Sequence, residues 1–291
     1  MTGIITVIGA RGKVGIELLK QLSEQGIPCR AVTRDVKNSI HLPHVTWIGG
    51  DLADVSGLPH LLAGSTRLFL NTDFSPRMAE MKAAVIAAAK KSGVRHIAYL
   101  SYGLMPEEII EKSNSMVHQQ HIQAEQALIH SGLDWTIIRP SAFMQSWLTE
   151  LAPTIIRERK IHEAPGEGRM PYIDTRDIAE VLSKVLTFPE KHRGKIYELT
   201  GGEPVSFYQV AEAIGQAIGE AVTYLPETPE DTRNRLQEKG YPEWAIQLLL
   251  YFAQCQREGR VAYTTNTLPE ILGRPGRTIY SFARDYAGGF K

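Results

Sequence analysis

The chain has 291 residues, of which 43% are hydrophobic, and its formal net charge is zero. This length allows one large α/β domain or a core domain with an added lobe, and the apolar content is enough for a full core. A zero net charge argues against a nucleic-acid-binding protein, because such proteins carry a basic excess or a basic stripe. The two cysteines, Cys29 and Cys255, give neither a disulfide framework nor a metal-ligand spacing.

No segment of the sequence suggests a membrane protein. The first residues lead directly into a predicted strand, so we expect no signal peptide. No run of about twenty apolar residues occurs, so we expect no membrane span. We therefore predict a soluble, cytoplasmic protein that acts on a small-molecule substrate, with neither nucleic acid nor membrane as a partner. Monomer and homodimer both remain open.

The N-terminal segment has the order strand, glycine turn, helix, strand. Residues 4–8 are a compact β-branched run, which is typical of a buried strand. A second strand is predicted at residues 28–33. Between them, apolar residues recur at helical spacing, at Val14, Leu18, Leu19 and Leu22. This order is the opening of a dinucleotide-binding fold.

Each glycine of the turn has a physical role in that fold. Gly9 allows the tight turn out of the strand, and Gly12 lets backbone N–H groups approach a pyrophosphate without an intervening Cβ. Gly15 lets the helix pack closely on the sheet, and the helix N-terminus adds its positive dipole end. The alternative is a turn that only closes the sheet. We predict that the whole turn contacts a cofactor: Gly9, Ala10, Arg11, Gly12, Lys13, Val14 and Gly15.

Strands and helical patterns continue to alternate as far as residue 140. Strands are predicted at 45–48, 67–70, 96–100 and 135–139, and helices at 55–63, 78–92 and 115–130. This alternation predicts a parallel sheet covered by helices on both faces. Beyond residue 140 the alternation fades, with helices predicted at 146–158, 174–186, 206–217 and 241–258 and one late strand at 195–199.

The predicted fold class is α/β, a Rossmann-type doubly wound parallel sheet with a smaller C-terminal α/β substrate lobe. We expect the NAD(P)-binding core to span residues 1–145 and to be completed by about 171–200. The substrate-binding lobe would then comprise residues 146–170 and 203–291. In open sheets of this kind, ligands bind at the carboxyl ends of the strands.

Further motifs carry a family resemblance. The glycine turn, Arg34 after the second strand and the triplet 50–52 are followed in order by segments 92–96, 131–140, 174–179 and 199–202. In these features the chain resembles the NmrA-like group of atypical short-chain dehydrogenase/reductases over nearly its whole length. The resemblance implies NAD(P)H binding. Members of the group reduce quinones, dyes, imines or enones, and others only sense the cofactor.

The residue after the second strand bears on the choice of cofactor. NAD-binding relatives place an acidic residue there, whereas this chain has Arg34. A guanidinium can stack on adenine and pair with a 2′-phosphate, and Arg11 would add a second positive charge. We therefore predict NADP, with NAD as the alternative. The resemblance implies that Asp51 and Leu52 border the adenine, and Asn71 and Thr72 would line the middle of the cofactor.

The tyrosine and lysine of the usual Tyr-x-x-x-Lys dyad are missing, since no tyrosine has a lysine four residues later. By register with the family, Val117 and His121 occupy those two places, so His121 is predicted to contact the cofactor and to act in catalysis. Tyr102 is the predicted proton donor or stacking group. Ser101, Pro140, Ser141 and Phe143 would lie beside the cofactor. His118, His121 and Glu125 lack further metal-ligand spacing, so we expect no metal.

These observations predict an NADP-dependent oxidoreductase that transfers hydride to a small planar conjugated acceptor, such as a quinone, a dye or an imine-like compound, without the dyad. Hydride transfer needs only an oriented nicotinamide and an acceptor, because the cofactor carries the chemistry. The alternative is a non-catalytic NADP(H) redox sensor that regulates a protein partner. A sugar epimerase fits less well, because such enzymes need the missing tyrosine.

Overall fold

The computed structural model describes residues 3–103 and 116–291. Within them the chain divides into two compact units. The first comprises residues 3–103, 116–140 and 175–199, and the second comprises residues 141–174 and 200–291. The divisions fall after residue 140 and before residue 175, whereas they were expected after residue 145 and near residue 171. Ser115, the first residue of the helix predicted at 115–130, lies outside the described residues.

The first unit is built on a seven-stranded parallel sheet with the order β3-β2-β1-β4-β5-β6-β8. Its strands are β1 (Ile4–Ile8), β2 (Cys29–Thr33), β3 (Val45–Gly49), β4 (Ser65–Leu70), β5 (His96–Leu100), β6 (Asp134–Pro140) and β8 (Lys195–Leu199). The strand order reverses between β1 and β4. This reversal is the point at which open α/β sheets bind ligands, and the arrangement confirms the predicted Rossmann-type class.

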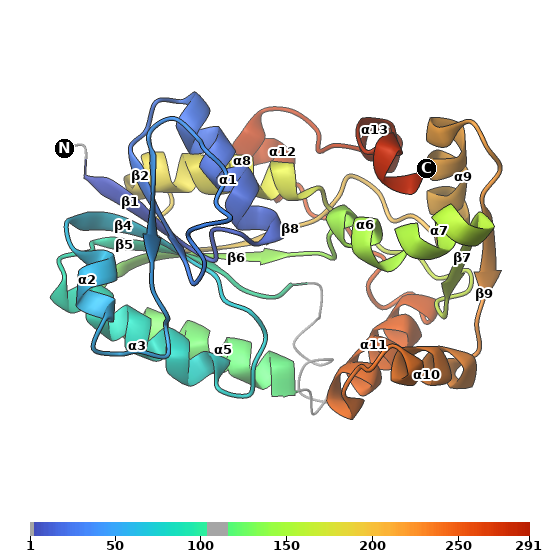
Figure 1. Ribbon diagram of the computed structural model, residues 1–291, viewed down its shortest axis with the longest axis horizontal. Coiled ribbons are helices and arrows are strands. Elements are labelled where there is room, and N and C mark those ends of the chain that lie inside the picture. Colours follow the sequence, from blue (N-terminus) through green and yellow to red (C-terminus); the bar gives the residue numbers. More distant parts are fainter. Residues whose placement is uncertain (1–2, 104–115) are drawn as a thin grey trace. The chain divides into compact units, whose positions relative to one another are not determined.

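Helices cover both faces of this sheet (Figure 1). On one face α1 (Lys13–Glu24) packs against α8 (Thr175–Thr187), and on the other α3 (Met78–Lys91) packs against α2 (Leu58–Leu62) and α5 (Met116–Ile129). A short 3-10 helix, η2 (Pro189–Lys191), precedes β8. The apolar faces that the sequence pattern predicted are buried: Leu18, Leu19 and Leu22 of α1 have no exposed surface.

The turn between β1 and α1 depends on glycine at two positions. Gly9 has a φ of +80°, a left-handed conformation that favours glycine. A Cβ added to Gly15 would lie 2.1 Å from the carbonyl oxygen of Gly9. At Gly12, by contrast, the backbone is extended (φ −71°, ψ 163°), and the nearest atom to an added Cβ would be 3.2 Å away. Gly9 and Gly15 are therefore needed for the fold itself, whereas a Cβ at Gly12 makes a tight contact with the Gly9 carbonyl oxygen that a small shift would relieve.

The second unit contains a two-stranded parallel sheet and several helices. Its elements are η1 (Met144–Ser146), α6 (Trp147–Glu150), α7 (Ala152–Glu158), β7 (Lys160–Glu163), α9 (Phe207–Ile218), β9 (Thr223–Pro226), α10 (Pro229–Glu238), α11 (Glu243–Arg257), α12 (Thr267–Leu272), α13 (Ile279–Asp285) and η3 (Ala287–Phe290). The ring of Trp147 lies at its core, 5.0 Å from the ring of Tyr172 and 5.5 Å from that of Phe282.

Two predicted helices are shorter or interrupted. The helix expected at 146–158 is divided into η1, α6 and α7, and Pro153 stands in the first turn of α7, where its missing N–H costs nothing. The helix expected at 55–63 begins only at Leu58, because the Asp54 carboxylate accepts the Ser56 N–H and holds a turn before it. Within the described residues, none of the helices is long and apolar enough to cross a membrane.

The glycine turn gives a test of the fold. We expect Gly15→Ala to lower the free energy of unfolding by roughly 1–3 kcal/mol, because the new methyl group would overlap the Gly9 carbonyl. Gly12→Ala is the matched control, and we expect it to cost less than about 1 kcal/mol at this extended N-cap position. Urea unfolding of both variants measures the difference. Equal stability of the two would contradict the close packing of α1.

Candidate functional site

The segments that leave the carboxyl ends of β1, β2, β4 and β5 lie at one edge of the parallel sheet in the first unit. The glycine turn follows β1, Arg34 follows β2, Asn71 follows β4 and Ser101 follows β5. Because all of these strands run in the same direction, residues far apart in the sequence come to the same edge. The predicted site residues of this unit therefore face a common region.

The glycine turn offers backbone donors to an anion. The Gly12 N–H donates to the Gly9 carbonyl at 3.0 Å, and α1 begins directly afterwards. No side chain caps this helix end, and the first turn holds no acidic residue. A helix N-terminus in this state binds phosphate through its N–H groups and its dipole. In the same turn Arg11 and Lys13 are exposed, whereas Ala10 and Val14 are buried and anchor it.

Asn71 supports the turn from the neighbouring strand. Its N–H donates to the Ile8 carbonyl at 3.3 Å, and its Nδ2 would lie 3.9 Å from a Cβ at Gly12. Thr72 follows, and its hydroxyl is buried with no hydrogen-bond partner among the described residues. Asn71 therefore lies beside the glycine turn, and the contact of Asn71 and Thr72 with the middle of a cofactor stays a prediction.

Arg34 and Arg11, near the turn, each form an ion pair with an exposed carboxylate. Arg34 Nη2 lies 3.6 Å from Asp73 Oδ2, and Arg11 Nη1 lies 3.6 Å from Asp35 Oδ2. The side chains of Arg34 and Asp73 are 78% and 96% exposed. Exposed pairs of this kind contribute about 0–1 kcal/mol, so either guanidinium can exchange its carboxylate for a phosphate at little cost.

The expected adenine border has a local structural role as well. Asp51 Oδ1 accepts the Ala53 N–H at 3.0 Å, which is a turn of the chain after β3. Leu52 is half-buried against the hydrophobic core of the first unit. The structure therefore places Asp51 as a turn residue at the correct edge, and its contact with a cofactor stays a prediction.

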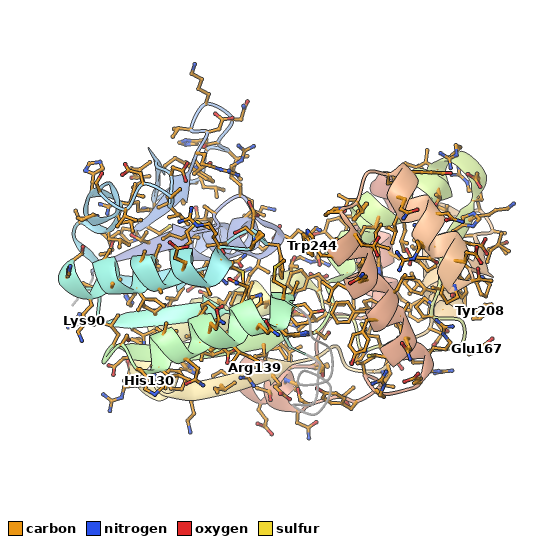
Figure 2. The ribbon with its side chains drawn as sticks, turned by 90° about the horizontal axis from the view of Figure 1, so that it is seen from below. Lys90, His130, Arg139, Glu167, Tyr208 and Trp244 are labelled. Carbon is orange, nitrogen blue, oxygen red and sulfur yellow. The ribbon has the colours of Figure 1, made fainter. Side chains whose placement is uncertain are left out.

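A buried polar cluster lies behind the segment after β5. The Ser101 hydroxyl donates to Glu125 Oε1 at 2.5 Å, and Arg139 binds the same carboxylate through Nε at 3.0 Å and Nη2 at 2.5 Å. Arg139 lies next to α5 (Figure 2). The two-point pair with Arg139 fixes the position of the Glu125 carboxylate, and the carboxylate in turn fixes the direction of the Ser101 hydroxyl.

Four rings surround the end of α5 nearest this edge. The His121 ring centroid lies 5.9 Å from that of Phe74 and 6.0 Å from that of Tyr102, and the rings of Tyr102 and His118 are 5.1 Å apart. Burial lowers the pKa of His118 to about 4. Burial, followed by the charges of Lys82 and His118, holds the pKa of His121 well below its ordinary value. Both imidazoles are therefore neutral at pH 7, and the cluster is aromatic and uncharged.

The sequence did not single out two residues of this region, Lys82 and Tyr99. Lys82 of α3 is fully buried, and its Nζ donates to the Tyr99 hydroxyl at 3.0 Å. The Tyr99 hydroxyl lies 3.1 Å from His121 Nδ1. The available signal was the spacing of Met78, Lys82 and Ile86, which places the lysine on the apolar face of its helix.

The remaining predicted residues are divided between the units. Pro140 ends β6 in the first unit, and its carbonyl accepts the Gly103 N–H at 3.1 Å. Ser141 and Phe143 belong to the second unit, where the Ser141 hydroxyl donates to the Pro171 carbonyl and Phe143 pairs with Ile173. Within the part of the chain that the structure describes, no group of three or more His, Cys, Asp and Glu side chains is arranged to hold a metal ion.

The chain is similar in sequence to proteins of known family. The NmrA-like family matches residues 1–263. The chain is 32% identical to the NAD(P)H azoreductase of Xenophilus azovorans over 292 aligned residues, which cover 99% of each chain.

Solved structures agree with this match. The NADPH-dependent quinone oxidoreductase of Escherichia coli, in complex with NADPH, superposes with a TM-score of 0.82 and 25% identity over 97% of this chain and 99% of its own. NmrA, a negative transcriptional regulator solved with NADP, has a TM-score of 0.76 at 20% identity over 99% of this chain and 96% of its own, and at that identity it shows the shared fold alone.

Proposed function

This chain belongs to the NmrA-like family, and we propose that it is an NADPH-dependent reductase of small planar conjugated acceptors such as azo compounds and quinones. Oxidoreductase activity with NADP is supported by the azoreductase that shares 32% identity and by the NADPH complex of the quinone oxidoreductase. We infer the class of acceptor from the cluster of aromatic rings at the edge of the sheet.

The residues of the first unit fit NADP. Gly12 has no Cβ, so the space beside its backbone is free for a pyrophosphate. The start of α1, which no side chain caps, supplies backbone N–H donors. Arg34 and Arg11 have guanidinium groups for the 2′-phosphate. The buried Thr72 hydroxyl, without a partner among the described residues, is a polar atom that such a ligand would satisfy. The cofactor, when bound, supplies the hydride.

The ring cluster favours a flat, uncharged acceptor. Phe74, Tyr102, His118 and His121 present aromatic and neutral groups, and planar conjugated molecules stack on such rings. No residue of the cluster carries a charge that would select an ionic substrate. The acceptor takes up two electrons with the hydride and one proton from the protein or from solvent.

We assign two roles within the cluster. Tyr102 is the proposed proton donor or stacking partner of the acceptor, because it leaves the carboxyl end of β5 and is half-buried. His121 is proposed to hold the nicotinamide ribose, because it occupies the family's lysine position and its imidazole is neutral. Ser101, Pro140, Ser141 and Phe143 are proposed to border the cofactor.

An acceptor panel tests the proposed reaction. We expect NADPH absorbance to fall on addition of quinones or azo dyes, at a rate proportional to the enzyme concentration. Tight NADPH binding without oxidation by any acceptor, together with cofactor-dependent protection of residues 220–260 from protease, would instead identify a redox sensor.

A second prediction concerns Arg34. We expect Arg34→Ala to weaken NADPH binding about ten- to hundredfold and NADH binding much less, because only NADPH carries the 2′-phosphate and a charged two-point contact contributes roughly 1.5–3 kcal/mol. Lys37→Ala removes a nearby exposed positive charge and is the matched control. Calorimetric titration with both cofactors provides the measurement. Equal weakening of NADPH and NADH would mean that Arg34 contacts only the adenine.

A further inference from the structure

Among the residues that the structure describes, the buried Lys82 of the first unit forms no hydrogen bond to a carboxylate. Lys82 Nζ lies 3.0 Å from the Tyr99 hydroxyl and 4.4 Å from the centroid of the Tyr99 ring, and the lysine has no exposed surface. Lysine is almost never fully buried unless it is paired, because removing its charge from water is costly. A position this costly is expected to serve a purpose beyond packing.

The phenol of Tyr99 links this lysine to the candidate site. Its hydroxyl lies 3.0 Å from Lys82 Nζ on one side and 3.1 Å from His121 Nδ1 on the other. Burial raises the pKa of Tyr99 far above its ordinary value, Glu125 adds to the rise and Ser101 opposes it. The phenol therefore keeps its single hydrogen in the neutral pH range.

Lys82, Tyr99 and His121 form a row of hydrogen-bonded side chains, and their hydrogen bonds determine which nitrogen of His121 carries its hydrogen. A lysine ammonium donates and has no lone pair with which to accept, so the Tyr99 hydrogen cannot go to Lys82. The Ser101 hydroxyl, 3.4 Å from His121 Nδ1, already donates to Glu125. Of the two side-chain atoms within 3.1 Å of the Tyr99 hydroxyl, Lys82 Nζ and His121 Nδ1, the imidazole nitrogen is the one that can accept its hydrogen. A neutral imidazole that accepts at Nδ1 carries its hydrogen on Nε2.

We propose that Lys82 and Tyr99 are positioning residues that fix His121 as the Nε2–H tautomer, so that its imidazole offers a hydrogen-bond donor at the carboxyl edge of the sheet. The rings of Phe74 and Tyr102, 5.9 and 6.0 Å from that of His121, mark this edge because they follow β4 and β5. The use of the donor, for a ribose hydroxyl oxygen of NADPH, rests on the proposed function, whereas the tautomer itself does not.

The row also makes the donor sensitive to pH. Burial lowers the pKa of Lys82 to about 7, and the Glu125 carboxylate partly opposes the shift. When Lys82 loses its proton, its amine gains a lone pair that can accept the Tyr99 hydrogen. Nδ1 is then free to carry the hydrogen of His121, and Nε2 becomes an acceptor. The donor is therefore present below about pH 7 and weakens above it.

The two histidines and the phenol of this group do not titrate near pH 7. His118 and His121 on α5 are neutral because burial lowers both pKa values. Glu125, also on α5, is held by Arg139 from β6 and by Ser101 after β5. Tyr99 on β5 keeps its hydrogen. A change of tautomer near pH 7 therefore belongs to Lys82 on α3.

Histidine nitrogen spectroscopy tests the proposal on the full chain without cofactor. With nitrogen-15-labelled histidine, and the His121 signals assigned from the spectrum of His121→Gln, we expect the Nε2–H tautomer at pH 6 and a shift towards Nδ1–H by pH 8.5. Tyr99→Phe is expected to lose the Nε2–H preference at pH 6, because Nδ1 loses its donor. Lys82→Met is expected to keep the Nε2–H tautomer but to lose its pH dependence.

His96 is the internal control, since it lies on the same strand as Tyr99 and its Nε2 is 3.1 Å from the Thr136 hydroxyl. Unchanged His96 signals show that a variant is folded, and if a variant does not fold, the pH series of the wild-type protein decides. An Nδ1–H tautomer in the wild type at pH 6 overturns the proposal. An unchanged tautomer in Tyr99→Phe also overturns the proposal. A pH-dependent change of tautomer that persists in Lys82→Met would show that Lys82 does not control the tautomer.

NADPH affinity gives the functional readout. We expect Tyr99→Phe to raise the Kd for NADPH about three- to tenfold at pH 6, which corresponds to one neutral hydrogen bond, and to have less effect at pH 8.5. A purely structural role of Tyr99 would change the Kd equally at both pH values. Because neither the spectra nor the Kd depends on turnover, a protein that binds NADPH in this way but reduces no acceptor would refute the proposed function and leave this inference intact.

Discussion

The carbonyl oxygen of Gly9 and the Cα of Gly15 approach so closely that no side chain fits between them, and the arrangement of the sheet edge depends on this contact. It brings the start of α1 directly over the end of β1, where the strand order reverses. The helix N-terminus, uncapped by any side chain, is thereby aimed at the position where a pyrophosphate binds in folds of this class. Asn71, which follows the neighbouring strand β4, contacts the turn. Arg34 and Arg11 lie near it, and each guanidinium group pairs with an exposed carboxylate.

The chemistry proposed at this edge relies on uncharged groups. By register with the family, Val117 and His121 are predicted to stand at the tyrosine and lysine positions, and burial lowers the pKa of His121 so that its imidazole is neutral. Lys82 is buried behind His121, and the Tyr99 hydroxyl lies between the two, 3.0 Å from Lys82 Nζ and 3.1 Å from His121 Nδ1. A neutral, ring-lined region suits acceptors that need hydride and little help from a strong protein acid. On this account the cofactor performs the chemistry, and the protein orients it and sets the hydrogen-bond direction.

Local patterns predicted most of the first unit. The bounds of β1, β5 and β8 were predicted from the sequence, and the glycine turn predicts a cofactor site at the end of β1. What local patterns missed depends on contacts between distant residues. Lys82 lies in a helix rich in Ala and Lys that resembles a solvated one, and only the packing of α3 against α5 buries it. Likewise β7 is four residues long and forms only because β9, some sixty residues later, pairs with it.

We propose that the glycine turn holds the pyrophosphate of NADPH, and the variant Gly12→Val tests this binding most directly. The extended backbone at Gly12 suits a β-branched residue, and an added Cβ would approach the protein no closer than 3.2 Å, so the variant should fold. Circular dichroism and a calorimetric titration with NADPH are made on the same sample. We expect an unchanged spectrum and no detectable binding at concentrations that saturate the wild-type protein. Wild-type affinity in the folded variant would contradict the account.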